Sequence, residues 1–139
     1  MESLSTVPEA ENKNDIPLSA GERVLFASRT DAFCSETQET LKWDCKFTLT
    51  DRRIVVDGGD EIWTINIPDD IERFRIEEKG HGFMKITYTV IKLKKQIECL
   101  EGKVTLNGCV IYFKKRDIAK IKEITDKMFV PERIYEDDE

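Results

Sequence analysis

Alternation of apolar and polar side chains every two residues is the feature that most constrains how this chain can fold. It is clearest over residues 41–49, where apolar side chains occupy every second position: Leu41, Trp43, Cys45, Phe47 and Leu49. Successive side chains of a β-strand point to opposite faces, so this pattern is typical of a strand with one buried face. We therefore predict a strand over residues 41–49 with these five side chains facing the core.

Similar segments separated by turn residues predict a succession of about seven strands. We expect the other strands over residues 22–29, 53–56, 61–67, 71–78, 83–93 and 109–113, with residues 31–39 as a polar loop. Turns are predicted at residues 50–52, 57–60 and 80–82 and at the dipeptide Asn107-Gly108. Residues 94–107 are harder to assign, and we expect a short extra hairpin around residues 101–103.

The period changes to three or four residues near the C-terminus. Apolar side chains there recur on one helical face: Ile118, Ile121, Ile124 and Met128. This predicts an amphipathic helix from Asp117 to about Phe129, ended by Pro131. Seven short strands and one helix with an apolar stripe predict an α+β fold, mostly antiparallel β, in which the helix caps a partly open barrel.

The predicted organisation is one domain over residues 21–131 between two flanking segments. Residues 1–20 are polar and have no apolar period, so we expect a mobile lead-in, and residues 132–139 form an acidic tail. We see no apolar run long enough to span a membrane and no secretory signal, and we expect a cytoplasmic protein. The cysteines are then expected to be free thiols, with Cys45, Cys99 and Cys109 in the core.

The net charge of −6 is distributed unevenly along the chain. Residues 21–84 hold 14 acids and nine bases, whereas residues 85–122 hold ten bases and three acids. This asymmetry is compatible with an anionic partner or with two solvated faces. The basic part contains a candidate anion- or lipid-binding cluster: Lys92, Lys94, Lys95, Lys114, Lys115 and Arg116. The alternative is that these charges protect strand edges from aggregation.

No pattern in the sequence predicts catalysis. His81 is the single histidine and lies between two glycines without an accompanying nucleophile motif, so a hydrolase would need a well-formed pocket around it. The acid pairs Asp69-Asp70 and Glu77-Glu78 are neighbours in strand-like segments and point to opposite faces. We expect no enzyme activity, no cofactor and no metal site. We also expect no nucleic-acid partner, because no aromatic-basic motif of a known module is present.

Four short motifs occur in a particular order along the chain. They are residues 21–25 (GERVL), 47–55 (FTLTDRRIV), 63–71 (WTINIPDDI) and 113–117 (FKKRD). Together they resemble the pleckstrin-homology-like superfold, and in particular its bacterial pleckstrin-homology and GRAM-like branches, over about residues 21–130. The resemblance implies a seven-stranded, partly open barrel capped by one C-terminal helix.

The resemblance also implies a binding module. Eukaryotic members of the superfold often hold phosphoinositides with basic residues of the first strand-to-strand loop. Here that loop, residues 31–39, holds three acids and no base, so a lipid phosphate would be repelled there. The resemblance further implies peptide addition at a sheet edge or in a groove beside the helix, and self-association. We expect an interaction module for protein–protein contacts or self-association, and the alternative is a peripheral membrane module that uses the basic cluster.

Overall fold

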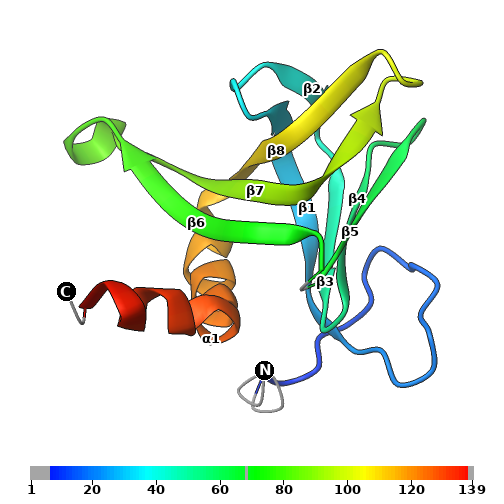
Figure 1. The fold of residues 1–139 in the computed structure, drawn as a ribbon, viewed down its shortest axis with the longest axis horizontal. Helices are drawn as coiled ribbons and strands as arrows, with labels where there is room; N and C mark the ends of the chain where they lie inside the picture. The colour runs from blue at the N-terminus through cyan, green and yellow to red at the C-terminus, as the bar shows by residue number, and fades with distance from the viewer. Residues whose placement is uncertain (1–6, 68, 138–139) are drawn as a thin grey trace.

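Antiparallel strands and one long helix account for most of the chain in the computed structural model, which describes residues 7–67 and 69–137, the last nine by their backbone alone (Figure 1). The strands are β1 (Val24–Ser35), β2 (Thr40–Trp43), β3 (Lys46–Thr50), β4 (Arg53–Asp57), β5 (Ile62–Asn66), β6 (Ile71–Lys79), β7 (Ile86–Cys99) and β8 (Val104–Phe113). The helical elements are the short 3₁₀ turns η2 (Gly82–Met84) and η3 (Lys115–Asp117) and the helix α1 (Ile118–Asp137).

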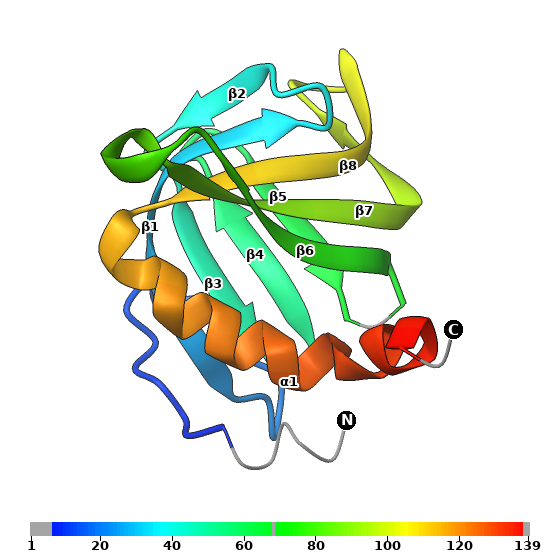
Figure 2. The same cartoon turned by 90° about the vertical axis from the view of Figure 1, so that its left-hand side faces the viewer.

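The strands form one curled sheet in the order β5-β4-β3-β1-β8-β7-β6, and β2 pairs with β1 beside this path. The first part of β1 pairs with β3 and its second part with β8, so β1 belongs to both halves of the sheet. Among the described residues β5 and β6 do not pair with each other, which leaves the barrel partly open. Helix α1 lies across one end of this barrel (Figure 2). The predicted α+β, pleckstrin-homology-like barrel with one C-terminal helix is therefore confirmed.

The core fills the space between the curled sheet and α1. Phe47 of β3 lies edge-on to Phe113 of β8, with 4.8 Å between the ring centroids. The helix side chains Ile121, Ile124 and Met128 are buried in the same cluster. The apolar stripe predicted for the helix thus covers the barrel interior, as expected.

Two predictions for the first half of the chain are wrong. The polar residues 31–39 are not simply a loop, because β1 continues to Ser35. The strand predicted over residues 41–49 is interrupted between β2 and β3, where Asp44 has a left-handed backbone with φ of 56°. Aspartate tolerates this conformation, and Arg29 donates a hydrogen bond of 2.9 Å to its carboxylate. The alternation therefore shifts, and Trp43 is 69% exposed instead of buried.

The predicted turn at Asn107-Gly108 is also wrong, because both residues lie inside β8. A Cβ atom on Gly108 would lie 2.7 Å from the backbone oxygen of Ile91, so the glycine serves close approach of two strands. The chain reverses at residues 100–103, near the expected extra hairpin, which is the tip of a long β7–β8 hairpin. Strand β7 bulges on the way, between Lys92 and Ile97.

Helix α1 does not end before Pro131 but continues to Asp137. Proline inside a helix removes one helical hydrogen bond, and it can bend the helix without ending it. Figure 1 shows this bend between the orange and red parts of α1. The boundary predicted between domain and acidic tail therefore falls inside a helix.

The N-terminal segment differs from the mobile lead-in that we expected over residues 1–20. From residue 7 onwards it packs against the barrel, with Val7 and Ile16 buried. The side-chain amide of Asn14 donates to the backbone oxygen of Phe47 at 2.9 Å and to the hydroxyl of Thr48 at 3.0 Å. These contacts are scattered along the segment, and no regular spacing of apolar residues in the sequence predicts them.

Candidate functional site

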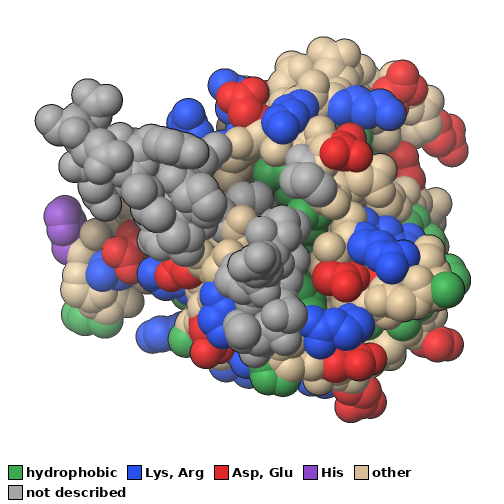
Figure 3. All heavy atoms as spheres, turned by 60° about the horizontal axis from the view of Figure 1, so that its bottom comes forward, with side chains coloured by type: hydrophobic (Ala, Val, Ile, Leu, Met, Phe, Trp, Pro, Cys, Tyr) green, Lys and Arg blue, Asp and Glu red, His purple; other side chains and the backbone are tan. Residues whose placement is uncertain are grey.

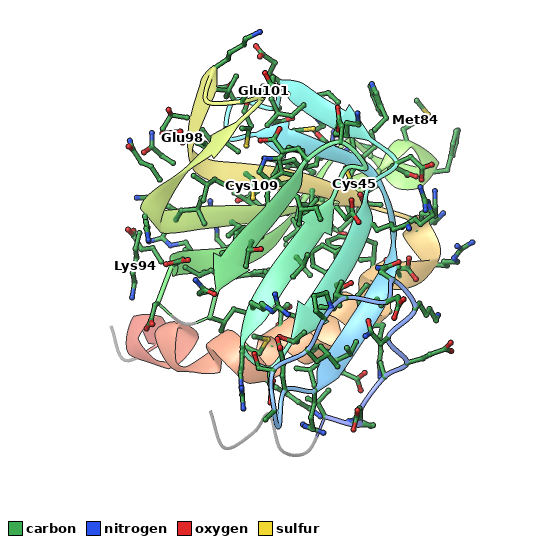
Figure 4. All side chains as sticks on the ribbon, turned by 90° about the vertical axis from the view of Figure 1, so that its right-hand side faces the viewer. Cys45, Met84, Lys94, Glu98, Glu101 and Cys109 are labelled. Atoms are coloured by element: carbon green, nitrogen blue, oxygen red, sulfur yellow. The ribbon has the colours of Figure 1, made fainter. Side chains whose placement is uncertain are left out.

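The structure divides the predicted basic cluster into two groups. Three members are exposed on β7: Lys92, Lys94 and Lys95. The other three lie where β8 leads into α1: Lys114, Lys115 and Arg116. Lys92 pairs with Gly108, six residues before Lys114, which corresponds to about 20 Å along β8. In Figure 4 Lys94 lies on the opposite side from the first turns of α1, so the six cations do not form one surface.

Two of these six cations already have acidic partners. Lys92 forms an ion pair with Glu72 at 3.2 Å, and Lys114 forms one with Asp31 at 2.7 Å. Among the residues whose side chains the structure describes, 7–67 and 69–128, the other four form no ion pair: Lys94, Lys95, Lys115 and Arg116. Asp31 belongs to the acidic stretch 31–39, so part of the charge asymmetry along the chain is neutralised in the fold.

A groove of about 480 Å³ lies between the N-terminal segment, β1 and the start of α1. We call it the β1 groove. Five basic side chains line it: Lys13, Arg29, Lys114, Arg116 and Lys120. Two acidic side chains also line it: Glu11 and Asp117. The sequence indicated two of these cations, whereas the other three were missed because only the fold brings the three segments together.

The pairing of β1 explains why the groove exists. Residues 24–29 of β1 pair with β3 along one edge, whereas pairing with β8 along the other edge begins only at Thr30. In the described part of the chain no strand therefore flanks residues 25–29 along the β8 edge. All five of these residues line the groove. Since successive side chains of a strand point to opposite faces, a groove that contacts five in a row runs along the strand edge. The backbone N–H of Ala10 donates to the oxygen of Val24 at 2.7 Å, where the N-terminal segment crosses this edge.

A smaller hollow of about 230 Å³ lies over β6, β7 and β8. Arg73, Arg75 and Lys92 line it together with Glu36. Two of these cations are paired with acids of β6, because Arg75 contacts Glu77 at 2.9 Å and Lys92 contacts Glu72. The hollow therefore offers little unpaired positive charge.

The turn between β6 and β7 displays large apolar side chains, and we call residues 82–86 the apolar knuckle. Phe83 is 97% exposed, Met84 is 67% exposed and Ile86 is half exposed. The only histidine lies beside them, and Figure 3 shows it in purple on a projection that also carries hydrophobic side chains in green. Figure 4 labels Met84 on this projection.

The backbone of the knuckle is held in a defined shape. The N–H of Met84 donates to the oxygen of His81 at 3.0 Å, and that of Lys85 donates to Gly82 at 3.2 Å. Gly80 has a φ of 93°, and a Cβ atom there would lie 2.6 Å from the oxygen of Met84. Only glycine fits both constraints, so the backbone of the turn that carries the apolar side chains has a defined conformation.

Groups suited to catalysis do not converge where the structure describes the chain. His81 is exposed and lines neither the β1 groove nor the smaller hollow. All four cysteines are free, as predicted, and all four are buried, including Cys34, whose burial was not predicted. Burial raises the pKa of Cys45 and Cys99 to about 11, so these thiols stay protonated at neutral pH. No group of three or more metal-ligating side chains is found among the described residues.

Comparison with protein-family models, curated proteins and solved structures finds no match to this chain. The pleckstrin-homology-like or GRAM-like relationship therefore stays a prediction from the motifs. Within the described part of the chain, no helix has both the length and the apolar character needed to cross a bilayer.

Proposed function

We propose that this protein is a non-enzymatic interaction module that contacts a protein partner through the apolar knuckle. The observation that carries the proposal is the 97% exposure of Phe83 on a turn whose backbone is fixed. An exposed ring of this size contributes almost nothing to the stability of the free chain. Aromatic residues and methionine are enriched at the centres of protein interfaces, where a few anchors carry most of the binding energy.

The charges beside the knuckle favour a protein over an anionic membrane. The neighbouring strand ends carry Glu77, Glu78, Lys79 and Lys85, which sum to zero net charge. Lys85 is paired with Glu78 at 3.3 Å, and the ammonium of Lys79 donates to a glutamine side chain. A membrane of anionic lipids attracts surplus lysine and arginine by about 1 kcal/mol each, and the strand ends beside the knuckle offer no surplus. A partner with an apolar pocket and a polar rim fits the knuckle better.

The test compares the wild type with a variant that removes both anchors, Phe83→Ser with Met84→Ser. A matched control is Ile62→Ser, because Ile62 is 61% exposed on β5 and lies outside the knuckle. Tagged proteins at equal amounts are used to capture partners from the native cell, and recovery is quantified by mass spectrometry. We expect a partner that the wild type and the control retain and that the double variant loses by about tenfold or more, equivalent to 1.4 kcal/mol or more.

Equal recovery by all three proteins would refute the role of the knuckle. Light scattering after size-exclusion chromatography adds a second readout: a dimer of the wild type that the double variant loses would identify the partner as a second copy of the chain. Flotation with vesicles of phosphatidylcholine and phosphatidylglycerol is the third. Flotation that depends on Phe83 would assign the knuckle to membranes and overturn the protein assignment.

A further inference from the structure

The sulfur atoms of the chain differ sharply in their access to solvent. Among the described residues all four cysteines are buried and Met128 is only 7% exposed, whereas Met84 of the apolar knuckle is 67% exposed. We propose that Met84 is a reversible oxidation site, and that its conversion to the sulfoxide by a peroxide switches off binding by the knuckle. The effect on binding rests on the proposed function, whereas the oxidation itself does not.

Burial withdraws the competing sulfur atoms from an oxidant. A cysteine reacts with a peroxide as the thiolate, so it needs both deprotonation and access to solvent. The four thiols have neither in the folded chain, because they are buried and burial raises the pKa of each of them. A thioether has no proton to lose, and its reactivity follows its exposure. Met84 is therefore expected to be the first of the described sulfur atoms to react.

The reaction is a two-electron oxidation of the thioether by hydrogen peroxide. A lone pair of the Met84 sulfur attacks one peroxide oxygen, so that an S–O bond forms and the O–O bond breaks. The departing hydroxide takes the proton of the transferred oxygen and leaves as water. Methionine sulfoxide reductases reverse the change, with a pair of thiols that supplies two electrons and is oxidised to a disulfide.

The place of Met84 makes its polarity important for the knuckle. It follows Phe83 directly in the 3₁₀ turn η2, whose backbone hydrogen bonds give both residues a defined conformation. Oxidation replaces a soft apolar sulfur by a strongly polar S–O group beside the exposed ring. A partner pocket shaped for an apolar side chain offers no donor to this oxygen, so burial of the sulfoxide should weaken binding by about tenfold or more.

The oxidation is tested first on the purified full chain, treated with hydrogen peroxide and mapped by mass spectrometry of its peptides. We expect Met84 to be oxidised about tenfold or more faster than Met128 in the folded protein, and the two rates to agree within about twofold in guanidinium chloride. The unfolded sample is the control for differences in intrinsic reactivity. Equal rates in the folded protein would overturn the proposal at this step.

Two variants then link the oxidation to binding. Met84→Leu keeps an apolar side chain of similar volume but cannot be oxidised, and Met84→Gln introduces a polar group without an oxidant. Both variants should fold, because the side chain they replace is exposed. Retention on a phenyl column reports the apolar surface, and capture from the native cell reports the partner that the knuckle retains.

Peroxide should lower the retention of the wild type and reduce recovery of that partner by about tenfold, and a methionine sulfoxide reductase should restore both. Met84→Leu should retain the partner with or without peroxide, and Met84→Gln should lose it without peroxide. Loss of the partner by peroxide-treated Met84→Leu would place the effect at another residue and overturn the proposal.

The remaining outcomes separate this proposal from the proposed function. A partner that the double serine variant loses but the oxidised wild type still binds would leave the knuckle as a binding site and overturn the switch. If no partner depends on the knuckle, the proposed function fails and the switch fails with it. The oxidation rates of the two methionines still decide in that case whether Met84 is the reactive sulfur.

Discussion

Replacing Glu22 by glutamine is the change whose effect the structure defines best. The Glu22 side chain is only 1% exposed, and its carboxylate accepts hydrogen bonds from the Arg53 guanidinium at 2.9 Å and the Thr50 hydroxyl at 2.7 Å. It also accepts the backbone N–H of Ser19 at 2.9 Å. Arg53 donates as well to the backbone oxygen of Pro17, so the pair fixes the end of the N-terminal segment to the barrel.

The pKa of Glu22 gives the magnitude. Burial alone would raise this pKa, but the hydrogen bonds from Arg53, Ser19 and Thr50 and the charge of Arg53 outweigh burial and lower it from 4.5 to about 2. At 1.36 kcal/mol per pKa unit, the difference corresponds to about 3 kcal/mol of folding free energy at pH 7. Removing one partner of a buried ion pair costs about 3–5 kcal/mol in other proteins, which agrees.

The pH dependence follows from the direction of the pKa change. Because the folded-state pKa lies below the unfolded-state value, the stabilisation is complete above about pH 5 and is lost as the pH falls towards 2. About 1.4 kcal/mol of it is left at pH 3. The wild type should therefore exceed Glu22→Gln by about 3 kcal/mol at pH 7 and by about half of that at pH 3.

Urea unfolding followed by tryptophan fluorescence measures both values. Trp63 is buried and stacks on Phe33 with 4.7 Å between the rings, so its emission reports loss of the core. We expect the midpoint at pH 7 to fall by about 1.5 M urea. The control is Glu123→Gln, whose exposed pair with Lys120 should matter by less than about 0.5 kcal/mol. A difference below 1 kcal/mol at pH 7, or one that does not change between pH 7 and pH 3, would refute the argument.

Three further changes test the fold and the knuckle. Phe47→Ala removes a fully buried ring and should cost about 3–5 kcal/mol in urea unfolding, whereas Phe83→Ala should cost less than about 0.5 kcal/mol, and similar losses would contradict the burial assigned to the two rings. Gly80→Ala forces a Cβ atom against a backbone oxygen and should cost about 1 kcal/mol more than Gly59→Ala, which has a positive φ but open space; equal costs would mean that the knuckle backbone is not fixed. The four buried thiols should not react with a disulfide reagent within minutes in native buffer at pH 8 but should all react in guanidinium chloride, and one fast native thiol would show that a cysteine is accessible.

The architecture could be predicted because its main signals are local. Strands β4, β5 and β6 begin and end within one or two residues of the predicted bounds, since each is a short segment with strand-forming apolar residues between turn residues. The start of α1 was predicted within one residue from its period of three to four. Such patterns arise because one face of the element is buried, and they can be read from the sequence without knowledge of the fold.

The errors arise where the environment of a residue is set by residues that are distant in the sequence. Ala32 and Cys34 are buried on the outer side of β1 by Tyr88 and Val110, which come from strands far along the chain. The polar stretch that contains them therefore forms a strand, although its own composition suggests a loop. Gly108 likewise reads as a turn residue until its closeness to β7 is known.

The site was less predictable than the fold for the same reason. Lys114 and Arg116 could be selected from the basic run that follows β8, but Lys13 and Arg29 join them only because the N-terminal segment folds back across β1. The knuckle was visible as a glycine-rich turn. Its exposure was not predicted, because Phe83 and Met84 were assigned to the following strand and not to the turn.

Strand β1 has a thermodynamic consequence for the molecule as a unit. In the part of the chain that the structure describes, β1 alone joins the β3–β5 and β6–β8 halves of the sheet, since it is hydrogen-bonded to strands of both. Loss of β1 would leave the edges of both β3 and β8 unpaired, so we expect both halves to unfold in the same cooperative transition. A mutation that destabilises one half should then also reduce the protection of backbone amides from hydrogen exchange in the other half.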